Sequence, residues 1–198
     1  MANRGQWIAV GVVLGALGFG LGAAWLLTPE IARVEPGRKA PNATMVTLDG
    51  GDTVSVEDLR GEVVLLNVWA TWCAPCEQEM PSMQRLHNQL GREGLKVVAV
   101  SIDQGDAESV MRWIDERHLT FTVLHDRTGR IQQVYQTTGV PESWVLDREG
   151  VIVKKVIGAT EWDHPAQQAM FRRLLGIRRG PARDTAVFGD TALPDRGR

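Results

Sequence analysis

Two cysteines are the residues of this sequence that are best placed to do chemistry. The 198-residue chain contains two cysteines, and they stand three positions apart in Trp72-Cys73-Ala74-Pro75-Cys76. Two thiols with this spacing at the start of a helix can close a disulfide without unwinding the turn. Unpaired backbone N–H groups and the helix dipole at that end favour a thiolate, the reactive form of cysteine. The spacing therefore predicts thiol–disulfide exchange, with Cys73 attacking and Cys76 resolving.

Three other uses of the cysteine pair compete with this interpretation. A structural disulfide would close so short a loop that it removes only about 2 kcal/mol of chain entropy, against about 4.7 kcal/mol for a 100-residue loop. A zinc site needs two more ligands, and the four histidines show no paired spacing. A Cu(I) site would use both thiolates with Met80 or Met83, which fall on the apolar stripe of a predicted helix. We expect a redox pair with no metal and no cofactor.

The cysteine pair lies where a predicted strand meets a predicted helix. Residues 62–68 (EVVLLNV) form a nearly continuous apolar run, as in a strand buried on both faces. Residues 74–90 place four apolar side chains on one helical stripe: Met80, Met83, Leu86 and Leu90. Further strands and helices alternate over residues 95–102, 107–118, 121–124, 129–135, 143–146, 151–157 and 165–175. This alternation, preceded by a hairpin over residues 45–48 and 54–56, predicts an α/β sandwich with a central sheet.

Two segments resemble motifs of the thioredoxin superfamily: Trp69-Ala70-Thr71-Trp72-Cys73-Ala74-Pro75-Cys76 and Gly139-Val140-Pro141-Glu142-Ser143-Trp144. The apolar N-terminal segment, the leading hairpin and an inserted helix–strand pair make the chain most similar to the membrane-anchored TlpA/ResA-type thiol–disulfide oxidoreductases, which carry a redoxin (AhpC/TSA-like) domain. The resemblance covers about residues 40–175. It implies a thioredoxin-like sandwich with a mixed central sheet, an N-terminal β-hairpin and one preceding transmembrane helix.

The resemblance also assigns residues to the substrate-binding surface. Pro141 matches the family's cis-proline, which lies beside the active-site disulfide. Val140 would then present a backbone edge with which a substrate segment can pair. Trp72, before the first cysteine, and Pro75, between the two, would complete this surface.

Glu79 is the candidate proton carrier. It lies one helical turn after Cys76 and matches an acidic residue that the anchored reductases carry near their cysteines. A carboxylate there would raise a thiol pKa or relay a proton; an ordinary glutamate favoured by the helix dipole is the alternative. The chain departs from cytosolic thioredoxins at Asn67, where they carry a buried aspartate that handles a proton. Because an amide does not titrate, Glu79 or water would transfer the proton instead.

The N-terminal part of the sequence predicts attachment to a membrane. No charged side chain occurs from Trp7 to Leu27, a length that spans a hydrocarbon core of about 30 Å as one helix. A cleaved signal peptide is the alternative. The expected organisation is a short tail at 1–6, a transmembrane helix or signal anchor at 7–27, a proline-containing linker at 28–41, the thioredoxin-like domain at 42–176 and a disordered tail at 177–198.

Sidedness and partners follow from the resemblance rather than from charge. Arg33, Arg38 and Lys39 follow the apolar segment, and by the positive-inside rule alone they would leave the domain in the cytoplasm. The resemblance implies instead a single-pass protein whose domain faces the periplasm or the cell exterior. The expected partners are a disulfide-bearing client protein, a membrane thiol donor protein and the lipid around residues 7–27. The formal net charge of −2 does not indicate the excess of basic residues that is typical of nucleic-acid-binding proteins.

The cysteine pair predicts reduction of client disulfides, and the resemblance implies that the clients belong to cytochrome c maturation or to oxidase copper-site assembly. A copper-site metallochaperone-like assembly factor is the first alternative. A thiol peroxidase is the second, but the related peroxiredoxins need a threonine three residues before the reactive cysteine. Ala70 occupies that position relative to Cys73, so the sequence argues against a peroxidase.

Overall fold

The structure is a computed structural model that describes residues 11, 13–16, 18, 19 and 33–177. The chain divides into two compact units, residues 1–33 and 34–198. The described residues of the first unit are all exposed, and all but residue 33 at its end are helical. Within the described part of the chain, no helix has both the length and the apolar character needed to cross a membrane. The predicted span at 7–27 and the predicted tail at 177–198 lie largely outside the described residues.

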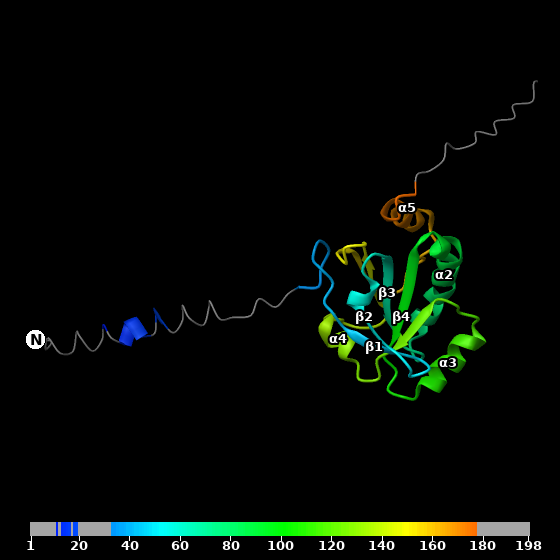
Figure 1. Ribbon diagram of the computed structural model, residues 1–198. Helices are drawn as coiled ribbons and strands as arrows, with labels where there is room; N and C mark the ends of the chain where they lie inside the picture. The colour runs from blue at the N-terminus through cyan, green and yellow to red at the C-terminus, as the bar shows by residue number, and fades with distance from the viewer. Residues whose placement is uncertain (1–10, 12, 17, 20–32, 178–198) are drawn as a thin grey trace, which may run out of the picture. The chain divides into compact units, whose positions relative to one another are not determined.

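A seven-stranded mixed sheet forms the centre of the second unit (Figure 1). Three strands of the sheet are parallel to one another: β3 (Val63–Trp69), β4 (Leu95–Ser101) and β5 (Thr122–His125). Four strands flank them in antiparallel pairings: β1 (Thr44–Thr47), β2 (Thr53–Ser55), β6 (Glu142–Leu146) and β7 (Ile152–Ile157). The order across the sheet is β2-β1-β5-β4-β3-β6-β7. Every residue of β3 is buried, as its apolar sequence predicts.

Helices cover both faces of the sheet. The helical segments of this unit are η1 (Val56–Leu59), α2 (Ala74–Leu90), η2 (Gly91–Glu93), α3 (Ala107–Glu116), α4 (Arg130–Val134) and α5 (Pro165–Leu174). The crossovers from β3 to β4 and from β4 to β5 step in the same direction, so α2 and α3 lie on one face (Figure 1). Next to α4, the Tyr135 ring packs edge-on against Trp144 on the opposite face, with centroids 4.8 Å apart. The predicted α/β sandwich with a mixed central sheet is confirmed.

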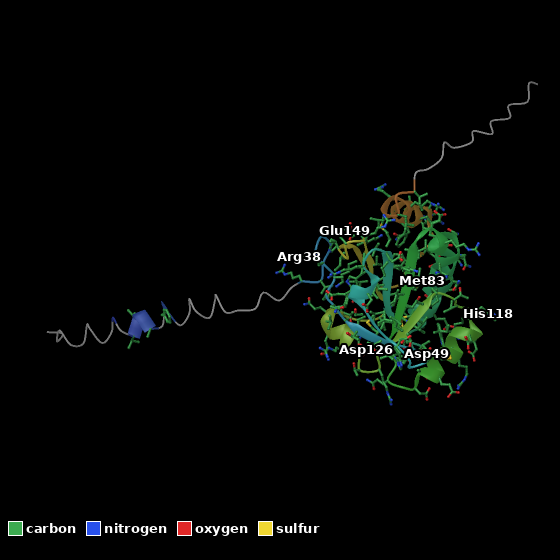
Figure 2. The ribbon with its side chains drawn as sticks, viewed as in Figure 1. Arg38, Asp49, Met83, His118, Asp126 and Glu149 are labelled. Carbon is green, nitrogen blue, oxygen red and sulfur yellow. A yellow bond between two sulfur atoms is a disulfide. The ribbon has the colours of Figure 1, made fainter. Side chains whose placement is uncertain are left out.

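The apolar stripe of α2 packs into the core. Met80, Met83, Leu86 and Leu90 are all buried, and Figure 2 labels Met83 among the strands and helices of the interior. Pro81 lies inside this helix and, lacking an N–H, removes one helical hydrogen bond. The stripe fixes the rotation of α2 and therefore fixes which side chains of its first two turns point at the sheet.

The folded unit begins before residue 42, the domain start expected from the sequence. Val34 is buried. The Gly37 N–H donates to the Ile152 carbonyl at 2.8 Å, and the Ala40 N–H donates to the Gly150 carbonyl at 2.9 Å. Figure 2 labels Arg38 and Glu149 at this edge. Prolines and mixed charge are typical of a linker, but the backbone of this stretch pairs with the β6–β7 turn, far away in sequence.

Candidate active site

Cys73 and Cys76 form a disulfide at the amino end of α2. Cys73 is the N-cap of the helix, and Pro75 lies in the first turn, where its missing N–H would have had no partner. The backbone N–H of Cys76 donates to the Sγ of Cys73 at 3.2 Å. After reduction the same N–H would stabilise a thiolate on Cys73. The strand–helix junction predicted for the cysteine pair is therefore present.

The two sulfurs differ in accessibility. Cys73 is 5% exposed and Cys76 is fully buried. Beside them, the Trp72 side chain is 68% exposed and Pro75 is also exposed. An incoming disulfide therefore meets Cys73 first, next to an indole ring available for contact. This asymmetry supports the predicted order of attack by Cys73 and resolution by Cys76.

The Val140–Pro141 peptide bond is cis, as the resemblance implied. Pro141 is buried and Val140 is partly buried. In the antiparallel pairing of β3 with β6, Val68 lies opposite Glu142. The start of β6 therefore lies beside the end of β3, and the structure places Val140 and Pro141 at the strand end that leads to Cys73.

Glu79 is buried on the sheet side of α2, with 1% of its surface exposed. Its Oε1 accepts a hydrogen bond from Asn67 Nδ2 at 2.8 Å. Its Oε2 accepts from the Thr160 N–H at 3.2 Å and from Trp162 Nε1 at 3.3 Å. All three donors are neutral, so no cation among these partners offsets the carboxylate charge. Asn67 also donates to Ser143 Oγ at 2.8 Å, which ties Glu79 to β6.

Burial raises the pKa of Glu79 from its ordinary value of 4.5 to about 7. Removal of the carboxylate from water is the largest cause, and the hydrogen bonds from Thr160, Asn67 and Trp162 oppose it. A carboxyl group with this pKa exchanges its proton near neutral pH. Its place in α2, one turn after Cys76, therefore favours the proton-carrier interpretation over an ordinary helix-dipole glutamate.

A pocket lies next to this buried residue. Glu79 lines a pocket with a volume of about 650 Å³, together with Gln78, Lys154, Thr160, His164 and Met170. The Lys154 Nζ donates to Gln167 Oε1 at 2.9 Å at the same site. The pocket therefore borders Glu79 on the side that faces α5.

A second buried carboxylate lies directly after the cis-proline. Glu142 is fully buried, its Oε1 lies 2.7 Å from Lys155 Nζ, and its Oε2 accepts from the Thr138 N–H at 3.0 Å. It thereby ties the loop that carries Val140 to β6 and β7. Sequence reasoning missed this residue, although a charged residue at the start of an apolar strand is a signal that could have identified it.

A pair of tilted aromatic rings joins the end of β3 to α3. The rings of Trp69, at the end of β3, and Trp113 have centroids 4.8 Å apart. The Arg117 guanidinium lies 3.9 Å from the Trp113 ring centroid and 2.7 Å from Glu77 in the first turn of α2. No periodic signal in the sequence indicates this contact, because its members come from three separate elements.

Comparison with known proteins identifies the family. The model of the AhpC/TSA family matches residues 36–155. The thiol–disulfide oxidoreductase ResA of Bacillus cereus is 33% identical over 147 residues, which are 74% of this chain and 83% of that protein. The chain belongs to the AhpC/TSA family and is a ResA-type thiol–disulfide oxidoreductase.

Two further proteins are similar to this ResA-type chain. The thioredoxin-like protein YneN of Bacillus subtilis (strain 168) is 34% identical over 153 residues, covering 74% of this chain and 86% of that protein. A crystal structure described as a DsbE thiol:disulfide interchange protein from Chlorobium tepidum has a TM-score of 0.65 and 31% identity. It covers 72% of this chain and 99% of that one. The substrates of a ResA-type oxidoreductase are disulfide-bearing proteins, and the Cys73–Cys76 pair is the redox pair that the structure offers for them.

The structure also bears on the Cu(I) alternative for this ResA-type site. Met80 is 1% exposed and Met83 is 0% exposed, so both thioethers are enclosed by the core. Over the described residues, no group of three or more histidine, cysteine, aspartate or glutamate side chains is arranged to hold a metal ion. The two methionines that the sequence offered as copper ligands are therefore core residues.

Proposed function

We propose that this oxidoreductase is a membrane-anchored disulfide reductase whose clients are extracytoplasmic proteins of cytochrome c maturation or oxidase copper-site assembly. The thiolate of Cys73 attacks one sulfur of the client disulfide, forms a mixed disulfide and releases the other client sulfur as a thiolate. Cys76 then attacks the Sγ of Cys73 and releases the second client sulfur. The client gains two electrons and two protons, and the enzyme is left with its Cys73–Cys76 disulfide.

The buried carboxyl group of Glu79 is the observation that carries this proposal. Cys76 must lose a proton before it can attack, yet it is fully buried. Glu79 has a pKa of about 7, so at neutral pH a large fraction of it is ionised and can accept that proton. The pocket beside Glu79 would then take the proton toward solvent. A carboxylate near the two thiols also disfavours their thiolate forms, which stabilises the disulfide and makes the dithiol more reducing.

The location and the electron donor belong to the same proposal. Both cysteines of the sequence are in the one pair, so each turnover leaves a disulfide that another protein must reduce. We assign this task to a membrane thiol donor. A membrane helix at residues 7–27 would hold the domain on the periplasmic or outer side and raise its local concentration near that donor.

The equilibrium reduction potential tests the proposed direction. The full chain in detergent micelles is equilibrated in glutathione and dithiothreitol buffers, and the fraction of Cys73–Cys76 disulfide is measured by alkylation and mass spectrometry. A reductase should lie near or below the value of about −270 mV typical of thioredoxin. A potential near the value of about −120 mV typical of DsbA would make the protein an oxidant and overturn the proposal.

The client class needs its own experiment. A Cys76→Ser variant should trap a mixed disulfide with a peptide that carries the oxidised haem-binding cysteines of an apocytochrome c, or with the oxidised copper-site segment of an oxidase subunit. A peptide of the same composition with its disulfide between differently spaced cysteines serves as the control. If both target peptides react no faster than this control, the proposed clients are wrong, whatever the reduction potential.

A further inference from the structure

Asp103 is a buried carboxylate on the β4 side of the redox pair, whereas Glu79 is linked through Asn67 to β6, and neither step of the proposed disulfide exchange uses Asp103. It follows β4, is 7% exposed and contacts the loop between β3 and α2. Its Oδ2 accepts from the Thr71 N–H at 3.0 Å, and its Oδ1 accepts from Thr71 Oγ1 at 2.7 Å. Thr71 is thus held through both its backbone and its side chain, two residues before Cys73.

Asp103 is itself held in place from two directions. Ser101 Oγ donates to Asp103 Oδ2 at 2.7 Å and accepts from the Asp103 N–H at 3.1 Å. The Nε2 of His125 lies 2.7 Å from the Asp103 carbonyl oxygen. Ser101 and His125 are paired residues of β4 and β5. Asp103 is therefore anchored to residues of the parallel strands β4 and β5.

Asp103 lies where a backbone N–H of the cysteine loop needs a hydrogen-bond acceptor. The last backbone bond between β3 and β4 runs from the Ile102 N–H to the Trp69 carbonyl at 3.0 Å. Beyond it the chain turns away from the sheet, and the Cys73 N–H donates to the Ala70 carbonyl at 3.2 Å. The N–H of Thr71, between these two bonds, has no neighbouring strand to pair with, and the Asp103 carboxylate takes that place.

We propose that Asp103 is a positioning residue for thiol–disulfide exchange, which holds Thr71 so that Cys73 is kept at the amino end of α2. With the loop held, Sγ of Cys73 stays within reach of the Cys76 N–H, the contact that favours its thiolate. With the loop released, Cys73 spends less time in that position and its thiolate is less stabilised. The proposal rests on Cys73 being the attacking thiol, which is part of the proposed function, but not on the client or the direction of electron flow.

The test measures the reactivity of Cys73 in the reduced full chain. The alkylation rate with iodoacetamide is followed as a function of pH, with mass spectrometry to identify the modified cysteine. Asp103→Ala removes both hydrogen bonds to Thr71, and we expect alkylation near neutral pH to be about fivefold slower, since each ordinary hydrogen bond at the weak end of its range accounts for about twofold. The midpoint of its pH profile should move upward. Thr71→Val, which keeps the N–H bond and loses the hydroxyl bond, should give a smaller change in the same direction.

Two further variants separate positioning from charge and from general stability. Asp103→Asn keeps an oxygen that can accept from the Thr71 N–H and from the Ser101 hydroxyl, and its NH2 group can donate to the Thr71 hydroxyl, so it should remain within about twofold of the wild-type rate. Asp126→Ala is the matched control, because Asp126 is 6% exposed and its carboxylate accepts from Thr128 and Ile131, beside α4 in Figure 2. It should lower the melting temperature and leave the alkylation of Cys73 unchanged.

The outcomes are distinct. If Asp103→Asn is as slow as Asp103→Ala, charge rather than positioning is responsible, and the proposal is overturned. The same holds if Asp103→Ala and Thr71→Val lower only the melting temperature, as Asp126→Ala does. If Asp103→Ala does not fold, the rate and pH profile of Thr71→Val decide alone. Alkylation of the wild type at Cys76 instead of Cys73 would refute the order of attack in the proposed function and, with it, the role given to Asp103.

Discussion

Replacing Glu79 by glutamine should remove a pH dependence from the stability of the folded domain. In the folded protein the pKa of Glu79 is raised from 4.5 to about 7, so between these pH values the folded state keeps a proton that the unfolded chain has lost. The stability contributed by this proton is complete below about pH 4.5 and is lost as the pH rises through 7. At about 1.4 kcal/mol per unit of pKa, the loss is about 3 kcal/mol.

The difference between wild type and Glu79→Gln isolates this contribution. Glutamine has one acceptor oxygen, so it cannot accept from Asn67 on one side and from Thr160 and Trp162 on the other. The hydrogen bond that it loses shifts the free energy of unfolding by a similar amount at every pH. The pH-dependent part of the difference therefore belongs to the titration of Glu79, and other groups cancel.

Urea unfolding of the disulfide form of residues 34–198, followed by circular dichroism, measures this difference. Between about pH 4 and about pH 8, the free energy of unfolding of the wild type should fall by about 3 kcal/mol relative to Glu79→Gln. The control is Glu77→Gln, which removes a glutamate from the same part of α2 at a position whose side chain is 51% exposed. A difference that stays flat with pH, or that grows as the pH rises, would refute the assignment of a raised pKa to Glu79.

Three more predictions concern the redox pair and its surroundings. Cys76→Ser should accumulate a mixed disulfide with a client peptide on a non-reducing gel, whereas Cys73→Ser should form none; equal trapping by both variants would contradict the order of attack. Trp72→Ala should raise KM for a client peptide about fivefold and leave the reduction potential unchanged, because the indole is 68% exposed; an unchanged KM would remove Trp72 from the binding surface. Lys155→Met leaves Glu142 buried without its cation and should cost about 3 kcal/mol in urea unfolding, the low end for a buried pair because Lys155 is 21% exposed. Adding Glu142→Gln should recover most of that loss, and no recovery would show that the ion pair is not its source.

Local sequence patterns were sufficient for the elements that carry the site. The nearly continuous apolar run ending at Trp69 requires a strand with both faces covered, and the stripe of α2 allows one rotation of that helix. The helix predicted over residues 74–90 has those bounds in the structure. Hydrophobic burial determines the structure of these segments, and it produces a pattern of apolar residues that can be recognised in the sequence.

Polar contacts between residues far apart in the chain produce no periodic pattern in the sequence. Asn67 is an example. The sequence indicated only that this position lacks the titrating aspartate of cytosolic thioredoxins. The structure makes it the donor to Glu79 Oε1 and so part of the same proton site. Thr160 and Trp162, the other two donors, lie about eighty positions from Glu79 in the chain, and nothing in their local sequence indicates the contact.

Sheet topology accounts for the convergence of these groups on one end of the molecule. β3 and β4 are parallel, so Trp69 and Ser101 end level with each other, and the residues that follow them, Thr71 and Asp103, meet beyond the last ladder bond. β6 is antiparallel to β3, so it begins where β3 ends and brings Pro141 to the same place. The loop to Cys73 is therefore held by a carboxylate on the β4 side and bordered by the cis-proline on the β6 side. Glu79 reaches the site along α2, and its burial, which outweighs the hydrogen bonds from its neutral partners, raises its pKa to about 7. In the proposed function, a carboxyl group on the helix that starts at Cys73 would serve the buried Cys76 without opening the loop that presents Cys73 to a client.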